Sequence, residues 1–444
     1  MANWVADFLA ANANIQVVKR DRHALHVSGP GGTTIAYITG APMHYLDAGE
    51  WRPLDTTLVA LSGNYWGAPG CPARFNGADR TTEIIGTSYA QRTTRVAILD
   101  AANLSIKGAR AVPVGSRSGD CLIADGVIGG AGWQHVLRLT ESGVREELTL
   151  QAKPVGLPAN AGDWLVLDTV IGGATFPDGW VEEFNQAGMH FPLPSASDAN
   201  GDMPNCRRYA RTVAGVQHIY TGIPVAWLAT AAYPVSFDPN FTGDTVDGFI
   251  GGSNATYDTA RSTSASYNSD AVTLAVGQMT EYSVNRSFLK FDTSTIGAGS
   301  TVTQVNLQMV CRWNYSDADF DVQIVKYSWA GQDPLSAGNR ETAYDGCLAA
   351  ALDDHIWRNT SGMATGTQYT SDILSTAWVN TTAPTYYGLR SSEDSAASAP
   401  VVLELIQPAS ASNDTAAYRP VLIVAYEAAS TGFKHYLGLL GVGR

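Results

Sequence analysis

Charged side chains are scarce in this chain of 444 residues, because Asp, Glu, Lys and Arg together make up only 16% of it. Hydrophobic residues reach 45%, which is more than a disordered chain carries. The apolar segments are interrupted by 44 glycines and 20 prolines, and the first half lacks long segments with helical spacing. This composition predicts an all-β protein of many short strands.

Signals for export and for membrane insertion are also missing. The first ten residues contain no basic segment, and Asp7 interrupts their apolar run, so we expect neither a secretory signal nor a membrane partner. The five cysteines are widely spaced and form no CxxC pair, which predicts reduced, mostly buried thiols in a protein made in a cytoplasm. They are Cys71, Cys121, Cys206, Cys311 and Cys347.

Basic residues are too few for a nucleic-acid partner. The net charge is −13, and residues 236–428 carry 21 acidic side chains against 9 basic ones. Affinity for phosphate needs clustered Lys and Arg, so nucleic acid is excluded, whereas cation binding is compatible with this charge.

Known catalytic motifs are absent from the sequence, including the nucleophile elbow, the zinc motif His-Glu-x-x-His and the P-loop. His23 and His26 would face opposite sides of a strand, so a shared metal is not expected. The adjacent carboxylates Glu146-Glu147 and Glu182-Glu183 would also diverge. We therefore expect a protein that is not an enzyme, with a glycan hydrolase built from distant carboxylates as the least favoured alternative.

The clearest pattern in the chain lies between Arg286 and Val310, where two strands join through a turn region. In the first strand Phe288 and Lys290 point one way, while Leu289 and Phe291 point the other. This alternation predicts one face in a core and one in water.

A domain boundary is expected near residue 235, where a proline-containing segment coincides with the shift in charge. The predicted parts are an N-terminal arm with a short helix, a β-rich N-terminal domain, a second β domain and an apolar tail. They span 1–27, 28–235, 236–428 and 429–444. Two helical turns are also expected in the second domain, at Asp345–Trp357 and Thr370–Val379.

Seven segments of the second domain follow one another in the order of a known domain family. They are Asp244–Ile250, Asn285–Asp292, Ile296–Leu307, Val325–Trp329, Asp372–Trp378, Tyr387–Glu393 and Tyr418–Tyr426. Through them the domain resembles the DNRLRE family, which implies a two-sheet antiparallel jelly-roll sandwich with little helix. The resemblance covers 244–427, with a Gly/Thr-rich insertion at 360–369, and the family occurs in phage virion proteins, wall proteins and modular enzymes.

Two upstream segments, Tyr45–Leu58 and Gly143–Leu150, look like β-rich segments of tail-associated phage proteins and of cell-wall repeat toxins. The resemblance implies a structural component of a phage virion, in the tail, neck or capsid surface, that acts through protein–protein contacts. Other virion proteins and further copies of the chain are the expected partners. The alternative is a module that recognises a host surface glycan.

Both ends of the chain carry apolar side chains that could contact other virion subunits. Trp4, Phe8 and Leu9 share one face of a predicted helix over residues 2–13. The alternative is that both ends pack on their own chain. In the tail, the expected assembly contacts are Phe433, Tyr436, Leu437 and Leu440.

Five aromatic residues near expected strand ends are candidates for stacking on sugar rings, although core packing explains them equally well. They are Trp313, Tyr315, Trp357, Tyr386 and Tyr387.

A short acidic segment places Asp317, Asp319 and Asp321 at alternate positions. In a loop they could bind Ca²⁺ through carboxylate oxygens, but the segment lacks the glycine and the distal glutamate of an EF-hand loop. A solvated acidic loop is the favoured interpretation, and calcium is the only cofactor considered.

Overall fold

The computed structural model describes residues 4–429, except for 101–103, 119–120, 141–143, 156–161, 182–183, 187–188, 192–193, 200–203, 239–246, 269–272, 337, 412 and 414–415. Strands make up 50% of the structure and helices 13%, which confirms the predicted all-β class. All pairs of neighbouring strands within the described ranges are antiparallel.

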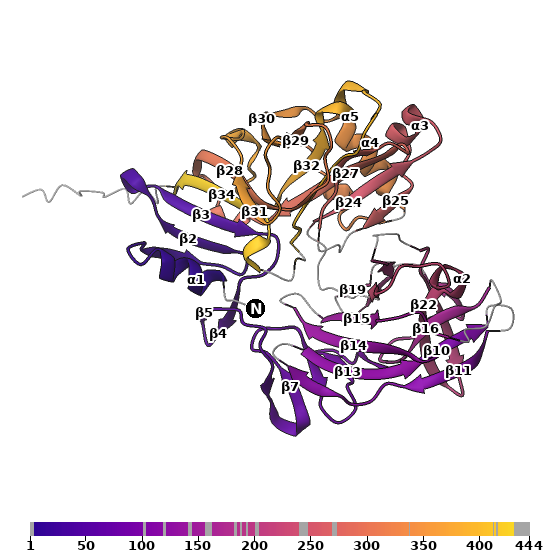
Figure 1. The fold of residues 1–444 in the computed structure, drawn as a ribbon. Helices are drawn as coiled ribbons and strands as arrows, with labels where there is room; N and C mark the ends of the chain where they lie inside the picture. The colour runs from indigo at the N-terminus through magenta and orange to yellow at the C-terminus, as the bar shows by residue number, and fades with distance from the viewer. Residues whose placement is uncertain are drawn as a thin grey trace, which may run out of the picture.

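The N-terminal unit contains two large sheets (Figure 1). The ten-stranded sheet has the order β17 (Gly179–Val181), β21 (Arg207–Val213), β22 (Val216–Pro224), β16 (Trp164–Gly172), β10 (Ala90–Asp100), β9 (Thr82–Ile84), β8 (Ala73–Asn76), β7 (Tyr65–Gly67) and β6 (Val59–Ala60), and β11 (Ser105–Ala111) pairs with β10. The six-stranded sheet has the order β12 (Ser116–Ser118), β13 (Cys121–Ile128), β14 (Ala131–Leu139), β15 (Val144–Leu150), β23 (Val235–Asp238) and β20 (Ser195–Ser197).

Smaller elements complete this unit. They are the hairpins β4 (His44–Asp47) with β5 (Glu50–Pro53) and β18 (Phe184–Gln186) with β19 (Met189–Phe191), and the helix α2 (Val225–Leu228).

The two large sheets of the N-terminal unit enclose an apolar core. Val96 and Ile98 of β10 belong to the same buried cluster as Leu148 and Leu150 of β15. In β14 and β15 every second residue is buried, which is the pattern of strands with one face in a core. The hairpin between β13 and β14 turns at Gly129-Gly130, and both residues have positive φ, as a tight two-residue turn requires.

The C-terminal unit is built on one 14-stranded sheet. Its order is β1 (Val17–Arg20), β2 (Ala24–Ser28), β3 (Thr34–Thr39), β34 (Val421–Glu427), β28 (Thr301–Asn314), β33 (Glu404–Pro408), β26 (Val276–Met279), β27 (Ser283–Phe291), β32 (Thr385–Ser391), β29 (Asp321–Val325) and β30 (Leu352–Asn359). Beside this path, β24 (Asp247–Ser253) pairs with β27 and with β25 (Ser266–Asn268), and β31 (Thr367–Thr370) pairs with β28.

This sheet folds over on itself as a sandwich. Leu307 of β28 and Val424 of β34 share one buried cluster with Leu289 of β27 and Leu389 of β32, although these strands lie far apart in the sheet order. Four helices accompany the sandwich in the described part of the chain, namely α1 (Trp4–Ala11), α3 (Tyr257–Ser262), α4 (Arg340–Ala349) and α5 (Ser392–Ala396).

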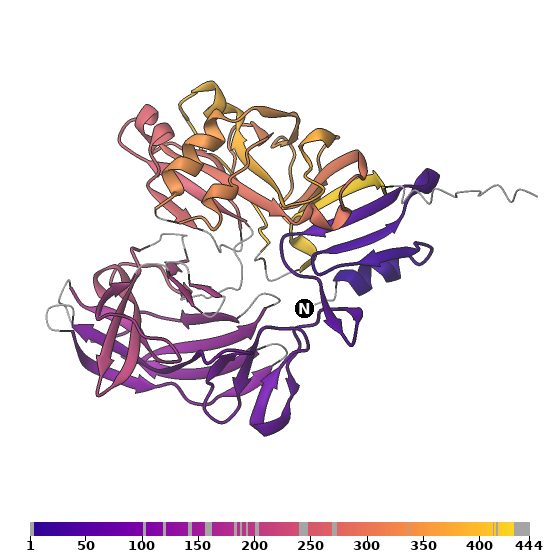
Figure 2. The ribbon, with the colours of Figure 1, turned by 180° about the vertical axis from the view of Figure 1, so that it is seen from behind.

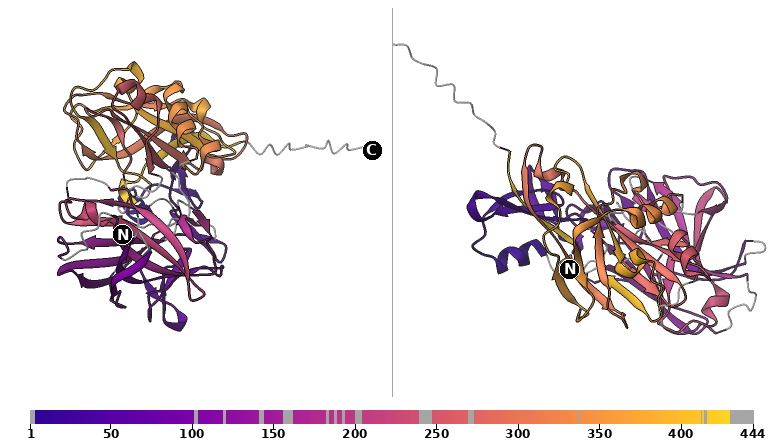
Figure 3. Two further views of the ribbon diagram at one scale, coloured as in Figure 1. Left: turned by 90° about the vertical axis from the view of Figure 1, so that its right-hand side faces the viewer. Right: turned by 90° about the horizontal axis from the view of Figure 1, so that it is seen from above.

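The first strands of the chain belong to the C-terminal sheet. Six consecutive residue pairs join β3 to β34, from Thr34 with Tyr426 to Thr39 with Val421. Figures 1 and 2 show the indigo β2 and β3 beside the yellow β34, and Figure 3 shows the two units as separate bodies from the side. The predicted N-terminal domain, 28–235, includes β3, which the structure places in the C-terminal sheet. At the other end β23 pairs with β15, so the N-terminal unit extends to Asp238.

Strand β27 corrects the expectation that one of its faces meets water. Leu289 and Phe291 enter the sandwich core, but Phe288 is also buried, in a second cluster with Tyr344 of α4. Lys290 forms an ion pair with Asp333 at 2.8 Å. The second face is covered because α4 and the segment before it pack across the strand.

The two predicted helical turns are only partly correct. The first expectation, Asp345–Trp357, contains the end of α4 but also most of strand β30. The second, Thr370–Val379, contains only one 3₁₀ turn, Thr376–Trp378. In the first segment the apolar residues were compatible with either structure, and pairing with β29 selects a strand after Ala349. The second segment is mostly irregular around its 3₁₀ turn.

Candidate functional site

The N-terminal helix packs on its own chain, which was the alternative to an assembly arm. Phe8 and Leu9 join the buried residues Val5 and Leu25 in one apolar cluster. The Phe8 ring lies 4.8 Å from the ring of Tyr37 on β3. The side chain of Trp4 and the tail residues Phe433, Tyr436, Leu437 and Leu440 lie outside the described residues.

The interpretation as glycan-stacking residues is wrong for three of the five aromatic candidates. Trp357, Tyr386 and Tyr387 are buried in the sandwich, where strand packing leaves no ring face for a sugar. Trp313 is half-buried, with the guanidinium of Arg312 4.8 Å from its ring. Only Tyr315 is widely accessible, with 45% of its surface exposed.

The three aspartates of the acidic segment are not grouped as ligands of one metal ion in the structure. Asp321 begins β29 and accepts a hydrogen bond from Asn359 at 2.7 Å, while Asp317 and Asp319 are exposed. Across the described residues, no group of three or more His, Cys, Asp or Glu side chains is arranged to hold a metal ion. The described helices also include none that is long and apolar enough to cross a bilayer.

All five cysteines are buried thiols, as the sequence predicts. Burial raises the pKa of Cys206 and Cys347 to about 12 and that of Cys311 to about 11. Such thiols are poor nucleophiles, so these three side chains serve packing.

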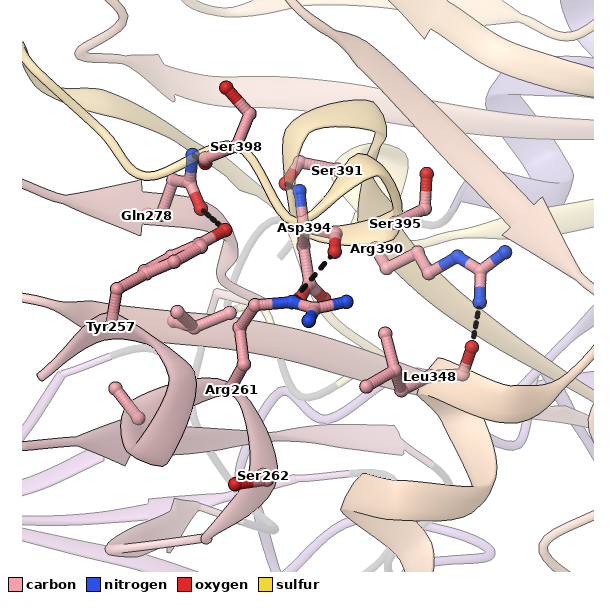
Figure 4. Close-up of polar contacts among 12 residues, drawn as sticks. Tyr257, Arg261, Ser262, Gln278, Leu348, Arg390, Ser391, Asp394, Ser395 and Ser398 are labelled. Atoms are coloured by element: carbon pink, nitrogen blue, oxygen red, sulfur yellow. Dashed lines mark hydrogen bonds and ion pairs between the residues drawn. The ribbon is translucent and has the colours of Figure 1, made fainter.

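A buried ion-pair network joins β27, α3 and α5, and Figure 4 shows one of its contacts, between Arg261 and Asp394. Arg286 of β27 donates from Nε to Oδ2 of Asp394 at 2.7 Å and from Nη2 to Oδ1 at 2.9 Å. Arg261 of α3 donates to the same carboxylate at 3.1 Å. Burial alone would lower the pKa of Arg286, but the contact with Asp394 raises it above its usual value.

Neighbouring polar groups in Figure 4 are also used within the fold. Tyr257 donates to Gln278 at 2.7 Å, and Arg390 donates to the carbonyl of Leu348. Together with the ion pairs, these hydrogen bonds hold α3, α4 and α5 against the sheet. We therefore assign this network to the stability of the C-terminal unit.

The ten-stranded sheet has an outer face, which points away from the six-stranded sheet. An accessible group of aromatic and charged side chains lies on this outer face. Residues on β10 alternate between the two faces, since Val96 belongs to the core and Ala97 to a separate outer cluster. Cross-strand register places nine side chains of interest on this outer face. They are Arg95, Trp164, Asp168, Trp180, Arg207, Tyr209, Arg211, His218 and Tyr220.

Three rings meet at one end of the outer face. Trp180 of β17 lies opposite Tyr209 of β21, and their ring centroids are 5.3 Å apart. Trp164 of β16 lies 5.8 Å from Trp180 on another side. The guanidinium of Arg207 is 5.5 Å from the Trp180 ring. Trp180 nevertheless keeps 49% of its surface exposed, so this group presents an aromatic surface to solvent.

Beside these rings, a buried carboxylate orients a histidine. Asp168 accepts hydrogen bonds from Nε of Arg95 at 2.5 Å and from Nδ1 of His218 at 2.7 Å. This contact places a proton on Nδ1 and leaves Nε2 of a neutral His218 as an acceptor. Tyr220 stacks on His218 at 6.0 Å, and burial together with Asp168 raises the pKa of Tyr220.

The outer face therefore offers ring surfaces, guanidinium donors and an oriented imidazole. Sequence reasoning did not single out these residues, because they come from five strands spread over more than 120 positions. One local signal was readable, since Arg207, Tyr209 and Arg211 alternate along a single strand and must share a face.

No family model matches the chain, and none of the curated proteins matches it. The resemblance to the DNRLRE family stays a prediction from the sequence.

Proposed function

We propose that the chain is a structural component of a tailed-phage virion, in the tail, neck or capsid surface, and that it acts through protein–protein contacts and not as an enzyme. The pairing of β3 with β34 is the observation that supports this role best. It brings strands from both ends of the chain into one sheet.

This pairing has a mechanical consequence for a subunit that transmits force. The chain leaves β3, forms the N-terminal unit and returns at β24, so two covalent connections join the units. A second connection limits the rotation that one linker would permit. In addition, the backbone hydrogen bonds that join β34 to both β3 and β28 resist a pulling force on the chain after β34. These properties suit a rigid spacer in a particle.

Removal of the apolar tail tests the proposed contacts. A chain that ends at Ala429 keeps every described strand, because β34 ends at Glu427. We expect this variant to retain the melting temperature of the full chain and to be lost from particles. A full-length control replaces the four predicted contact residues of the tail with serine and should behave in the same way.

Two results would contradict the proposal. One is normal incorporation of the truncated chain into particles, measured by immunoblotting of gradient-purified virions. The other is absence of the unmodified chain from those virions.

A further inference from the structure

We propose that the outer face around Trp180 binds an acidic glycan, that is, a chain of pyranose units that carry carboxylates. This inference goes beyond the assembly role and does not depend on it. The site consists of the rings Trp164, Trp180 and Tyr209 together with the cations around them, of which Arg207 is the nearest to the exposed ring.

The exposed ring is held in place before any ligand arrives. Trp180 contacts Trp164 at 5.8 Å and Tyr209 at 5.3 Å, from two different strands. A side chain fixed in this way loses little conformational entropy on binding, and this preorganisation favours recognition by aromatic anchors. With 49% of its surface exposed, the indole can cover the apolar C–H face of a sugar ring.

The outer face also contains a glycine, in β22. Gly222 lies between β16 and β21, opposite Val166 on one side and Arg207 on the other. A Cβ atom at Gly222 would lie 2.7 Å from Cγ1 of Val166 and 3.5 Å from Cβ of Trp164. Glycine at this position therefore leaves the part of the outer face between Val166 and Arg207 without a side chain.

The charge of the face selects an anionic ligand. Arg95, Arg207 and Arg211 share it, and the one carboxylate among its nine side chains, Asp168, is buried and already binds Arg95 and His218. Arg95 still exposes 37% of its side chain. Excess positive charge on a chain with a net charge of −13 is complementary to carboxylates, which arginine can bind through two parallel hydrogen bonds.

The acids next to the face are already bound within the fold. Lys107 on β11 pairs with both Asp163 at 3.0 Å and Asp100 at 3.1 Å, which leaves one net negative charge in this group. Asp178 accepts a hydrogen bond from the backbone of Thr212 and lies before β17. A neutral glycan would use the rings alone, whereas a carboxylated unit would use a ring and Arg207 together.

Calorimetry with the full chain tests this proposal. The probes are hexasaccharides from polygalacturonate and from alginate, with maltohexaose as the neutral control. We expect an acidic hexasaccharide to bind, and Trp180→Ala and Arg207→Gln each to weaken binding by about tenfold or more, since Trp and Arg commonly dominate binding energy. Trp180→Phe should retain most of the affinity because it keeps an aromatic ring.

The matched control is Arg110→Gln, which makes the same change in net charge at an exposed position of β11. It should bind like the unmodified chain, and added salt should weaken binding to the acidic probes only. Melting curves of all variants establish that they are folded. Failure of both acidic probes to bind at millimolar concentration would overturn the proposal, as would equal affinity for maltohexaose. Unchanged binding by a folded Trp180→Ala chain, or binding of a virion protein to this face instead, would also overturn it.

Discussion

The two units of the molecule each bury a carboxylate, and they neutralise it with different partners. In the N-terminal unit, Glu146 accepts hydrogen bonds from Nε2 of His135 at 2.6 Å and from Oγ1 of Thr93 at 2.5 Å. Arg80 lies on the other side of the imidazole, 3.1 Å from Nδ1. In the C-terminal unit, Asp394 is paired directly with two arginines.

This difference decides how each of these two networks responds to pH. The guanidinium of Arg80 can only donate, so Nδ1 of His135 must accept a hydrogen bond from it. The ring proton is therefore on Nε2, which donates a hydrogen bond to Glu146. Burial alone would raise the pKa of Glu146, but the contacts with His135, Thr93 and Arg80 lower it below its usual value. The N-terminal network thus depends on a histidine tautomer, whereas the C-terminal one rests on arginine charges that persist at all accessible pH.

The largest effect is expected for Asp394→Ala. It would leave the fully buried guanidinium of Arg286 without its carboxylate, which should cost about 3–5 kcal/mol of stability. Urea denaturation should show a destabilised C-terminal unit and an N-terminal transition that is nearly unchanged. Asp317→Ala, which removes an exposed acid from the same unit, should leave both transitions in place. Equal loss of stability in the two units would show that the networks are not independent.

Acid should weaken the sheet that joins the ends of the chain. Burial lowers the pKa of His26 on β2 and of His44 on β4 to about 4. The unfolded chain therefore takes up these protons first, near pH 6.5, and stability falls as the pH drops from about 6.5 to about 4. The loss should be on the order of 2–3 kcal/mol for each histidine.

Hydrogen exchange of β2, β3 and β34 at pH 7 and pH 5 measures this response, because His26 contacts Tyr426 of β34 at 3.0 Å. His26→Gln should flatten the pH dependence, and His355→Gln, at an exposed position, should not. Protection that is equal at both pH values would contradict the assignment of buried neutral histidines.

A smaller effect is expected for Glu146→Gln. His135 and Thr93 both donate to Oε1 of Glu146, so the amide oxygen can keep both contacts. The two hydrogen bonds lose the charge of their acceptor, which should cost about 1–2 kcal/mol at pH 7. Because the folded-state pKa of Glu146 is lowered, its contribution is present above pH 4.5 and is lost as the pH falls through the folded-state value. The variant should lose stability at pH 7 and show a weaker dependence on acid below pH 4.5, measured by thermal melts. An unchanged melting temperature at pH 7 would show that the charge of Glu146 does not stabilise the N-terminal unit.

The smallest changes should appear in thiol labelling, which reports the opening of each unit separately. Cys206 lies in the N-terminal unit and Cys347 in the C-terminal one, and both are buried with a pKa raised to about 12. Neither should react before its unit opens, and all five thiols should react in urea. Asp394→Ala should accelerate labelling of Cys347 but not of Cys206, as mass spectrometry of labelled peptides would show.

Local patterns in the sequence were enough to predict much of the fold. Alternation between Arg286 and Val310 predicts two strands joined by a turn region, and the structure has β27 and β28 there. The same reasoning failed for Trp357, which follows an alanine-rich segment that is compatible with a helix but lies in β30.

Contacts between distant residues were beyond sequence reasoning. Arg286 and Asp394 are 108 positions apart, and nothing in either segment specifies the other. The same holds for the pairing of β3 with β34 and for the outer face, where register across several strands brings the side chains together. Local periodicity indicates that a strand has an outer face, but not which strands lie beside it.

The central claim is that this chain is a structural part of a particle, and its copy number in purified virions tests that claim most directly. Virions of the phage that encodes the chain would be purified on a density gradient and digested. Isotope-labelled standard peptides from the N-terminal and C-terminal units would then be quantified by mass spectrometry. The account predicts both units in equal amounts, with several copies in each particle. Presence in the infected lysate but absence from the particles would contradict it.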